Sequence, residues 1–151
     1  MKATAKSAAW FLSIAGLIPF VGLATVVVTL PSHADFAFRA LLAYGMVILS
    51  FLGAIHWGAV LKQGNSNNQL YSVGGLVWGV VPSLLAWVTG AFDAHLQALW
   101  LVCGLLIALG VDMIAYRRYG IASWVLRIRW VATIGACVSL TTVALSYIPP
   151  A

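Results

Sequence analysis

The sequence predicts an all-α integral membrane protein, a bundle of five transmembrane helices. Of its 151 residues, 63% are hydrophobic and only 7% are charged, whereas soluble domains have about 25% charged residues. The apolar residues form long runs, which cross a bilayer as helices because an open sheet in lipid would leave its edges unpaired. The basic residues lie at the ends of these runs and not in one patch, so the formal charge of +5 does not indicate nucleic-acid binding.

We expect the five runs to form one transmembrane domain over residues 1–151. Each run has about 20 residues or more, enough to cross the ~30 Å hydrocarbon core at ~1.5 Å per residue. Residues 121–129, before the last run, are either an interfacial turn or the first turns of its helix. The predicted spans are residues 8–30, 39–62, 70–90, 96–116 and 124–148.

The first run has the alternative of being a cleaved signal sequence. Ser32-His33-Ala34 loosely fits a small-x-small cleavage site. The uncharged run of 23 residues is longer, however, than the ~7–15 residues typical of a signal peptide. We therefore expect it to be retained as a helix. Pro19 should kink or divide it, because proline removes a helical hydrogen bond and clashes with the preceding turn.

The distribution of basic residues predicts the orientation in the membrane. Five spans place the N-terminus and the second and fourth loops on one side. That side has seven of the eight basic residues, and the other side has only Arg39. By the positive-inside rule the N-terminus is cytoplasmic and the C-terminus lies outside. The seven are Lys2, Lys6, Lys62, Arg117, Arg118, Arg127 and Arg129.

Small residues form a stripe along one face of four runs. Helices in lipid associate through close packing of small residues, so these stripes should face the interior of the bundle. They are Gly45, Leu49, Gly53 and His56 in the second run, Gly75, Gly79, Pro82 and Ala86 in the third, Gly104, Ala108, Asp112 and Ala115 in the fourth, and Ala132, Ala136 and Ser139 in the fifth.

His56 and Asp112 are ionisable groups inside the predicted spans. His56 lies roughly 9 Å before Lys62 and Asp112 roughly 7.5 Å before Arg117 along their helices, so both have nearly the same depth. We expect them to lie close together, directly or through water, although the spacing leaves open whether their helices touch. Such a pair either satisfies itself and fixes the helix register, or carries protons or orients a ligand.

Six further polar-tipped groups lie near this depth, among them Tyr71 and Arg129. The other four complete the candidate site: Trp57, Trp78, Tyr116 and Arg127. Tryptophan and tyrosine at this level usually form an interfacial belt, and arginines usually anchor topology or contact headgroups. The functional alternative is a cytoplasm-facing pocket with aromatic walls and a basic rim for an anionic amphiphile.

The sequence gives little support for catalysis, and we predict no catalytic residue, metal or cofactor. Cys103 and Cys137 lie inside apolar runs, where cysteine acts as a packing residue, and no C-x-x-C spacing is present. His33 and His95 lie near the opposite face from His56, so a bis-histidine haem lacks its second ligand. Phosphate-loop and hydrolase motifs are absent, and an enzyme would have to use His56 and Asp112.

Three segments resemble the transmembrane protein 69 family, which has no established activity. Over most of the chain, from about Trp10 to the fifth span, the sequence is similar to members of that family. Family members occur in bacteria and mitochondria, so the resemblance implies a bacterial-type inner membrane. The segments are Tyr44–Gly58, which ends in SFLGAIHWG, Val81–Trp87 (VPSLLAW) and Trp124–Arg127 (WVLR).

The leading functional hypothesis is a non-enzymatic membrane assembly, stability or lipid-organising factor. The alternative is a protein that binds a quinone-like or lipid-like amphiphile around His56 and Asp112. A proton-coupled small transporter is third, because Pro19 and Pro82 could mark broken helices but no inverted repeat is visible. We expect membrane lipids as partners, with a membrane-protein partner or a second copy as further options, and no nucleic acid.

Overall fold

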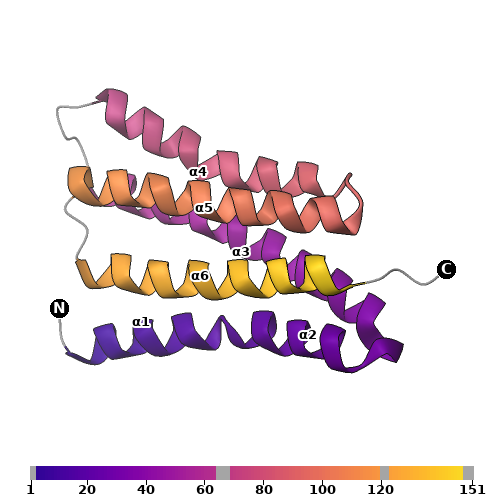
Figure 1. Cartoon of the computed structure of the whole chain (residues 1–151). Helices are drawn as coiled ribbons and strands as arrows, with labels where there is room; N and C mark the ends of the chain where they lie inside the picture. Colours follow the sequence, from indigo (N-terminus) through magenta and orange to yellow (C-terminus); the bar gives the residue numbers. More distant parts are fainter. Residues whose placement is uncertain (1–2, 64–68, 120–122, 148–151) are drawn as a thin grey trace.

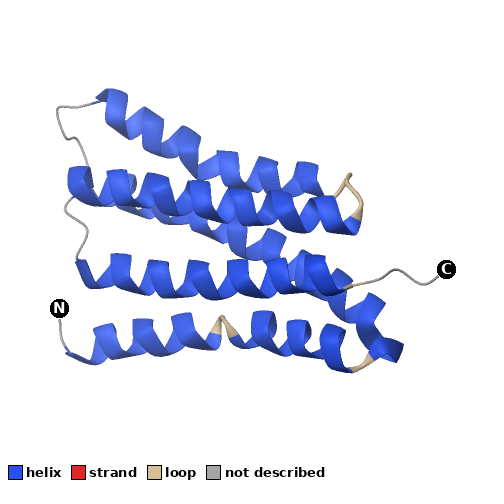
Figure 2. Cartoon of the chain, viewed as in Figure 1, coloured by secondary structure: helices blue, strands red, loops and turns tan. Residues whose placement is uncertain are grey.

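The described part of the protein is helical throughout, as the apolar runs predict. A computed structural model describes residues 3–63, 69–119 and 123–147. Short loops separate the helices (Figure 2). The elements are α1 (Ala3–Ala15), α2 (Ile18–Thr29), the 3-10 helix η1 (Pro31–His33), α3 (Ala34–Gln63), α4 (Gln69–Thr89), α5 (Ala94–Tyr119) and α6 (Ser123–Ser146).

Within the described residues, four helical segments are long and apolar enough to cross a membrane. They are Lys6–Thr29, Pro31–Leu61, Ala94–Ala115 and Ser123–Ser146. α4 contains a shorter apolar stretch, Val73–Thr89. The last helix begins at Ser123, so residues 123–129 form its first turns, whereas Ile121 and Ala122 lie outside the described residues.

The helices lie side by side along a common direction (Figure 1). α1 and α2 follow one another along one edge, α6 lies next to them, and α4 lies on the far side of the bundle. α3 crosses the bundle obliquely and packs most extensively against α4, while α5 packs against α6 and α2 against both α3 and α6. The start of α1, the ends of α3 and α5, and the starts of α4 and α6 share one end of the bundle.

The first apolar run is broken where Pro19 predicts. α1 ends at Ala15 and α2 begins at Ile18, with Pro19 in its first turn. Proline cannot donate the hydrogen bond that would continue the helix from the preceding turn. Near this break, the carbonyl oxygen of Gly16 accepts a hydrogen bond of 2.9 Å from the hydroxyl of Tyr44 on α3. The break is thus tied to the neighbouring helix by the Tyr44 hydroxyl.

The small-residue stripes face the interior, as predicted. Every member of the second- and third-run stripes is buried. α3 and α4 come closest at Gly53 and Gly79, because a Cβ atom on Gly53 would collide with the Gly79 carbonyl and one on Gly79 with the Trp57 ring. Glycine at both positions therefore allows the backbones to approach.

The end of the bundle opposite the N-terminus is held by contacts between α3, α5 and α6. The hydroxyl of Tyr147 donates a 3.0 Å hydrogen bond to Asp35 at the start of α3. The Nδ1 atom of His95 lies 2.9 Å from the carbonyl oxygen of Ala144. Phe38, fully buried, packs against the rings of both Tyr147 and His95. His95 therefore has a structural role at this end.

Candidate functional site

The structure brings together three ionisable side chains from three helices. His56 of α3 and Asp112 of α5 are joined by a contact of 2.9 Å between Nε2 and Oδ1. The Nε of Arg129 on α6 donates to the second carboxylate oxygen of Asp112 over 2.5 Å. The side chains are largely removed from solvent, with exposed fractions of 5% for His56, 15% for Asp112 and 13% for Arg129. We call these residues the polar triad.

Both oxygens of Asp112 have partners inside the protein. The guanidinium of Arg129 balances the carboxylate charge, and a neutral imidazole with its proton on Nε2 is sufficient to donate the other hydrogen bond. The triad therefore requires no additional ion. One donor is left over, because the Nη2 atom of Arg129 is buried and has no hydrogen-bond partner among the described residues.

A small cavity of about 60 Å³ adjoins the triad. Its remaining walls come from apolar residues of α3 and of the first turns of α6, and the full lining is Ile55, His56, Ala59, Asp112, Val125, Leu126 and Arg129. Across residues 3–63, 69–119 and 123–147, no group of three His, Cys, Asp or Glu side chains is arranged to hold a metal ion.

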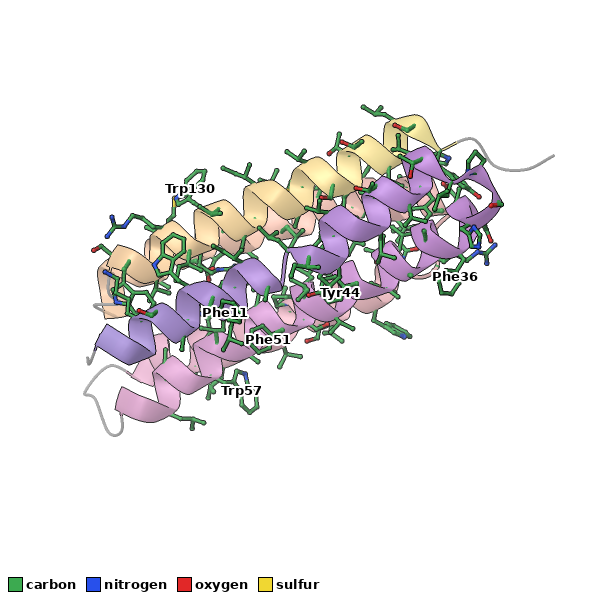
Figure 3. All side chains as sticks on the ribbon, turned by 90° about the horizontal axis from the view of Figure 1, so that it is seen from below. Phe11, Phe36, Tyr44, Phe51, Trp57 and Trp130 are labelled. Atoms are coloured by element: carbon green, nitrogen blue, oxygen red, sulfur yellow. The ribbon has the colours of Figure 1, made fainter. Side chains whose placement is uncertain are left out.

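The other residues predicted for the site have different positions. The ring of Trp78 meets the His56 ring edge to face, with centroids 6.4 Å apart, so it contacts the triad without lining the small cavity. Trp57 is 44% exposed and its indole nitrogen donates to the carbonyl of Leu76 on α4, away from the triad; it lies at the edge of the bundle in Figure 3. The side chain of Tyr116 lies outside the described residues.

The structure separates the two arginines near the start of α6. Arg127 is exposed, and Arg129 is the arginine that contacts Asp112. Two residues along a helix are turned by about 200°, so the two side chains lie on opposite faces. The sequence contained a signal for Arg129, because it precedes Ala132 by three positions and Ala136 by seven and therefore extends the inward stripe of the last helix.

A larger apolar groove runs from the triad along α6 toward the middle of the bundle. Its volume is about 370 Å³, and α1, α2, α3, α5 and α6 all contribute to its walls. Leu12 and Phe51 line it and are exposed over 68% and 61% of their surface, so the groove opens on an apolar face. Figure 3 shows this face from below, with Phe11 on α1 and Phe51 on α3. Arg129 is the one charged residue among those that line it.

The fold and the site define a multi-pass helical membrane protein with a buried polar node beside an apolar groove. The chain belongs to the DUF3429 family of proteins of unknown function, whose family model matches residues 5–145. The resemblance to transmembrane protein 69 that the sequence motifs indicate is confirmed by two relatives of that name.

The chain is 35% identical over 139 residues to transmembrane protein 69 of Xenopus tropicalis, an alignment that covers 90% of this chain and 53% of the relative. It is 31% identical over 145 residues to the protein of the same name from Mus musculus, with 94% of this chain and 58% of the relative covered. The chain thus spans little more than half the length of these relatives. No solved structure matches it.

Proposed function

We propose that this protein is a non-enzymatic membrane protein that organises lipid by holding the apolar chain of a lipid-like amphiphile in the groove between α1, α3 and α6. The observation that carries this proposal is the groove itself, an apolar cavity of about 370 Å³ with a single charged wall residue. This volume lies within the ~300–1,000 Å³ typical of small-molecule sites.

The exposed residues around the groove support a ligand that comes from the hydrocarbon and not from water. Leu12, Phe51 and Ile55 line the groove and are all exposed on the apolar surface of the bundle. In a bilayer such a surface faces lipid chains, so an apolar chain can enter sideways without crossing a polar layer.

The polar triad supports a structural role beside this groove. Asp112 has internal partners for both oxygens, and the node joins α3, α5 and α6. Buried polar groups of this kind fix the register of helices, and catalysis would require a group free to act on a substrate. A role in proton transfer or transport has no additional support from the geometry.

The proposal includes five membrane passes, with α4 as the third, a cytoplasmic N-terminus and a bacterial-type inner membrane. It is supported by the basic residues, because Lys6, Arg127 and Arg129 belong to the ends of α1 and α6 that lie together in Figure 1. Fusions after Ala151 test the orientation: a C-terminal alkaline phosphatase should be active and a C-terminal green fluorescent protein dark. The reverse pattern would contradict it.

Native mass spectrometry tests the lipid-binding proposal. Protein released from nanodiscs made of a defined lipid mixture should retain a bound lipid. Ala132→Phe fills the groove from α6 and should remove most of this lipid. The matched control is Val131→Phe, because Val131 is the neighbouring residue, is 46% exposed and does not line the groove. Equal lipid retention by the two variants, or none by the wild type, would overturn the proposal.

A further inference from the structure

Arg129 connects the two cavities at the triad. Both the groove and the small cavity are lined by Ile55 and Arg129, so the small cavity adjoins the charged end of the groove. Building on the proposed function, we infer that the ligand is an uncharged amphiphile with a carbonyl oxygen, and that this oxygen accepts a hydrogen bond from the guanidinium of Arg129.

The charge of the site favours an uncharged ligand. Arg129 and Asp112 are an ion pair, and His56 can complete its hydrogen bond to Asp112 as a neutral ring. The triad then has no net charge. A carboxylate or phosphate brought into this apolar region would add an unbalanced charge, which is costly away from water. An ester or ketone carbonyl adds an acceptor without adding a charge.

The unused donor favours an acceptor at this position. Nη2 of Arg129 is buried and lacks a partner within the described residues. A buried donor without an acceptor is destabilising, and guanidinium nitrogens donate but never accept. A carbonyl oxygen supplies lone pairs for this donor and brings no donor of its own that would need an acceptor.

The direction of the groove is consistent with a headgroup at Arg129 and a chain toward the bundle centre. From Arg129 the lining on α6 continues through Ala132 and Thr133 to Ala136. The seven steps from Arg129 to Ala136 cover about 10 Å along the helix. Leu17 and Phe20 close the deeper part, and both are apolar. The polar and apolar ends of an amphiphile thus match the two ends of the groove.

Three probes with the same chain test the inference: methyl laurate, laurate and dodecane, titrated into delipidated protein and followed by native mass spectrometry. Methyl laurate should bind roughly three- to tenfold more tightly than dodecane, the range expected for one added hydrogen bond, and more tightly than laurate. Equal binding of methyl laurate and dodecane would overturn carbonyl recognition while retaining the groove. Tighter binding of laurate would overturn the neutral headgroup. Binding of none of the probes would contradict the proposed function as well.

The double variant Asp112→Asn/Arg129→Leu provides the matched test of the donor. It removes both charges together, so neither is left unpaired, and leucine cannot donate. The preference for methyl laurate over dodecane should fall to about one, with dodecane still bound. An unchanged preference in a variant with native helix content would overturn the role of Arg129. If this variant does not fold, the comparison of the three probes on the wild type decides the inference alone.

Discussion

Nε2 of His56 and Oδ1 of Asp112 lie 2.9 Å apart, although 56 residues separate them in the chain. The contact joins α3 to α5, and the bond from Arg129 to the same carboxylate joins α6. One carboxylate therefore connects three helices. Arg129 belongs to this node and is also the charged residue in the wall of the groove, so the stability of the bundle and the polar end of the proposed binding site depend on the same residues.

The His56–Asp112 contact should be visible as an energetic coupling. We expect the single variants His56→Leu and Asp112→Asn each to destabilise the protein. The double variant should lose less than their sum, because residues in direct contact typically show coupling of about 0.5–3 kcal/mol. Thermal unfolding of the four proteins in detergent measures this cycle. Strictly additive losses would contradict the contact.

Arg129 and Arg127 should differ sharply in their effect on stability. Arg129→Leu leaves the largely buried carboxylate of Asp112 without its charge partner, and loss of one member of a buried pair typically costs about 3–5 kcal/mol. Arg127 is exposed, so Arg127→Leu should change stability by no more than about 0.5 kcal/mol. The two unfolding curves, recorded in the same detergent, give the comparison. Similar losses in both variants would show that the node has been misassigned.

The close approach of α3 and α4 predicts a difference between two glycines of one helix. A Cβ atom on Gly53 would collide with the backbone of Gly79, so Gly53→Ala should cost about 1–3 kcal/mol through overpacking. At Gly58 no atom lies within 4 Å of an added Cβ, and Gly58→Ala should be neutral or stabilising because alanine favours helix. The order of the two melting temperatures checks this prediction.

The bond from Tyr44 to Gly16 should hold the junction of α1 and α2. Tyr44→Phe removes the donor for the Gly16 carbonyl and should cost about 1 kcal/mol. Because α1 has few contacts with the rest of the bundle apart from α6, amide hydrogen exchange should increase in Leu12–Val21 and stay unchanged in α5. An unchanged exchange rate at the junction would contradict the role of this hydrogen bond.

Much of the architecture could be predicted from the sequence because lipid imposes strong constraints. Backbone groups in hydrocarbon must bond within their own helix, so long apolar runs had few alternatives to helix. Pro19 indicated the break in the first run, and the glycine stripes indicated the inward faces. Depth measured from Lys62 and Arg117 placed His56 and Asp112 at one level. Only the structure shows that α3 and α5 bring the two side chains into contact.

The details of the site were less accessible for physical reasons. Arg127 and Arg129 both lie near a helix end where arginines usually anchor topology, so composition did not distinguish them, and the distinction depends on which face of α6 points inward. Trp57 was expected at the site because it lies at the depth of His56, but adjacent residues on a helix point about 100° apart. The groove depends on side chains from five helices and has no sequence motif of its own.

The distance between the ligand carbonyl and Arg129 is the most direct test of the account. Solid-state NMR can detect the dipolar coupling between arginine labelled with ¹⁵N in the protein and methyl laurate labelled with ¹³C at its carbonyl. The account predicts a coupling in the wild type that persists in Arg127→Leu and disappears in Asp112→Asn/Arg129→Leu. Bound methyl laurate without such a coupling in the wild type, or with the same coupling in the double variant, would contradict it.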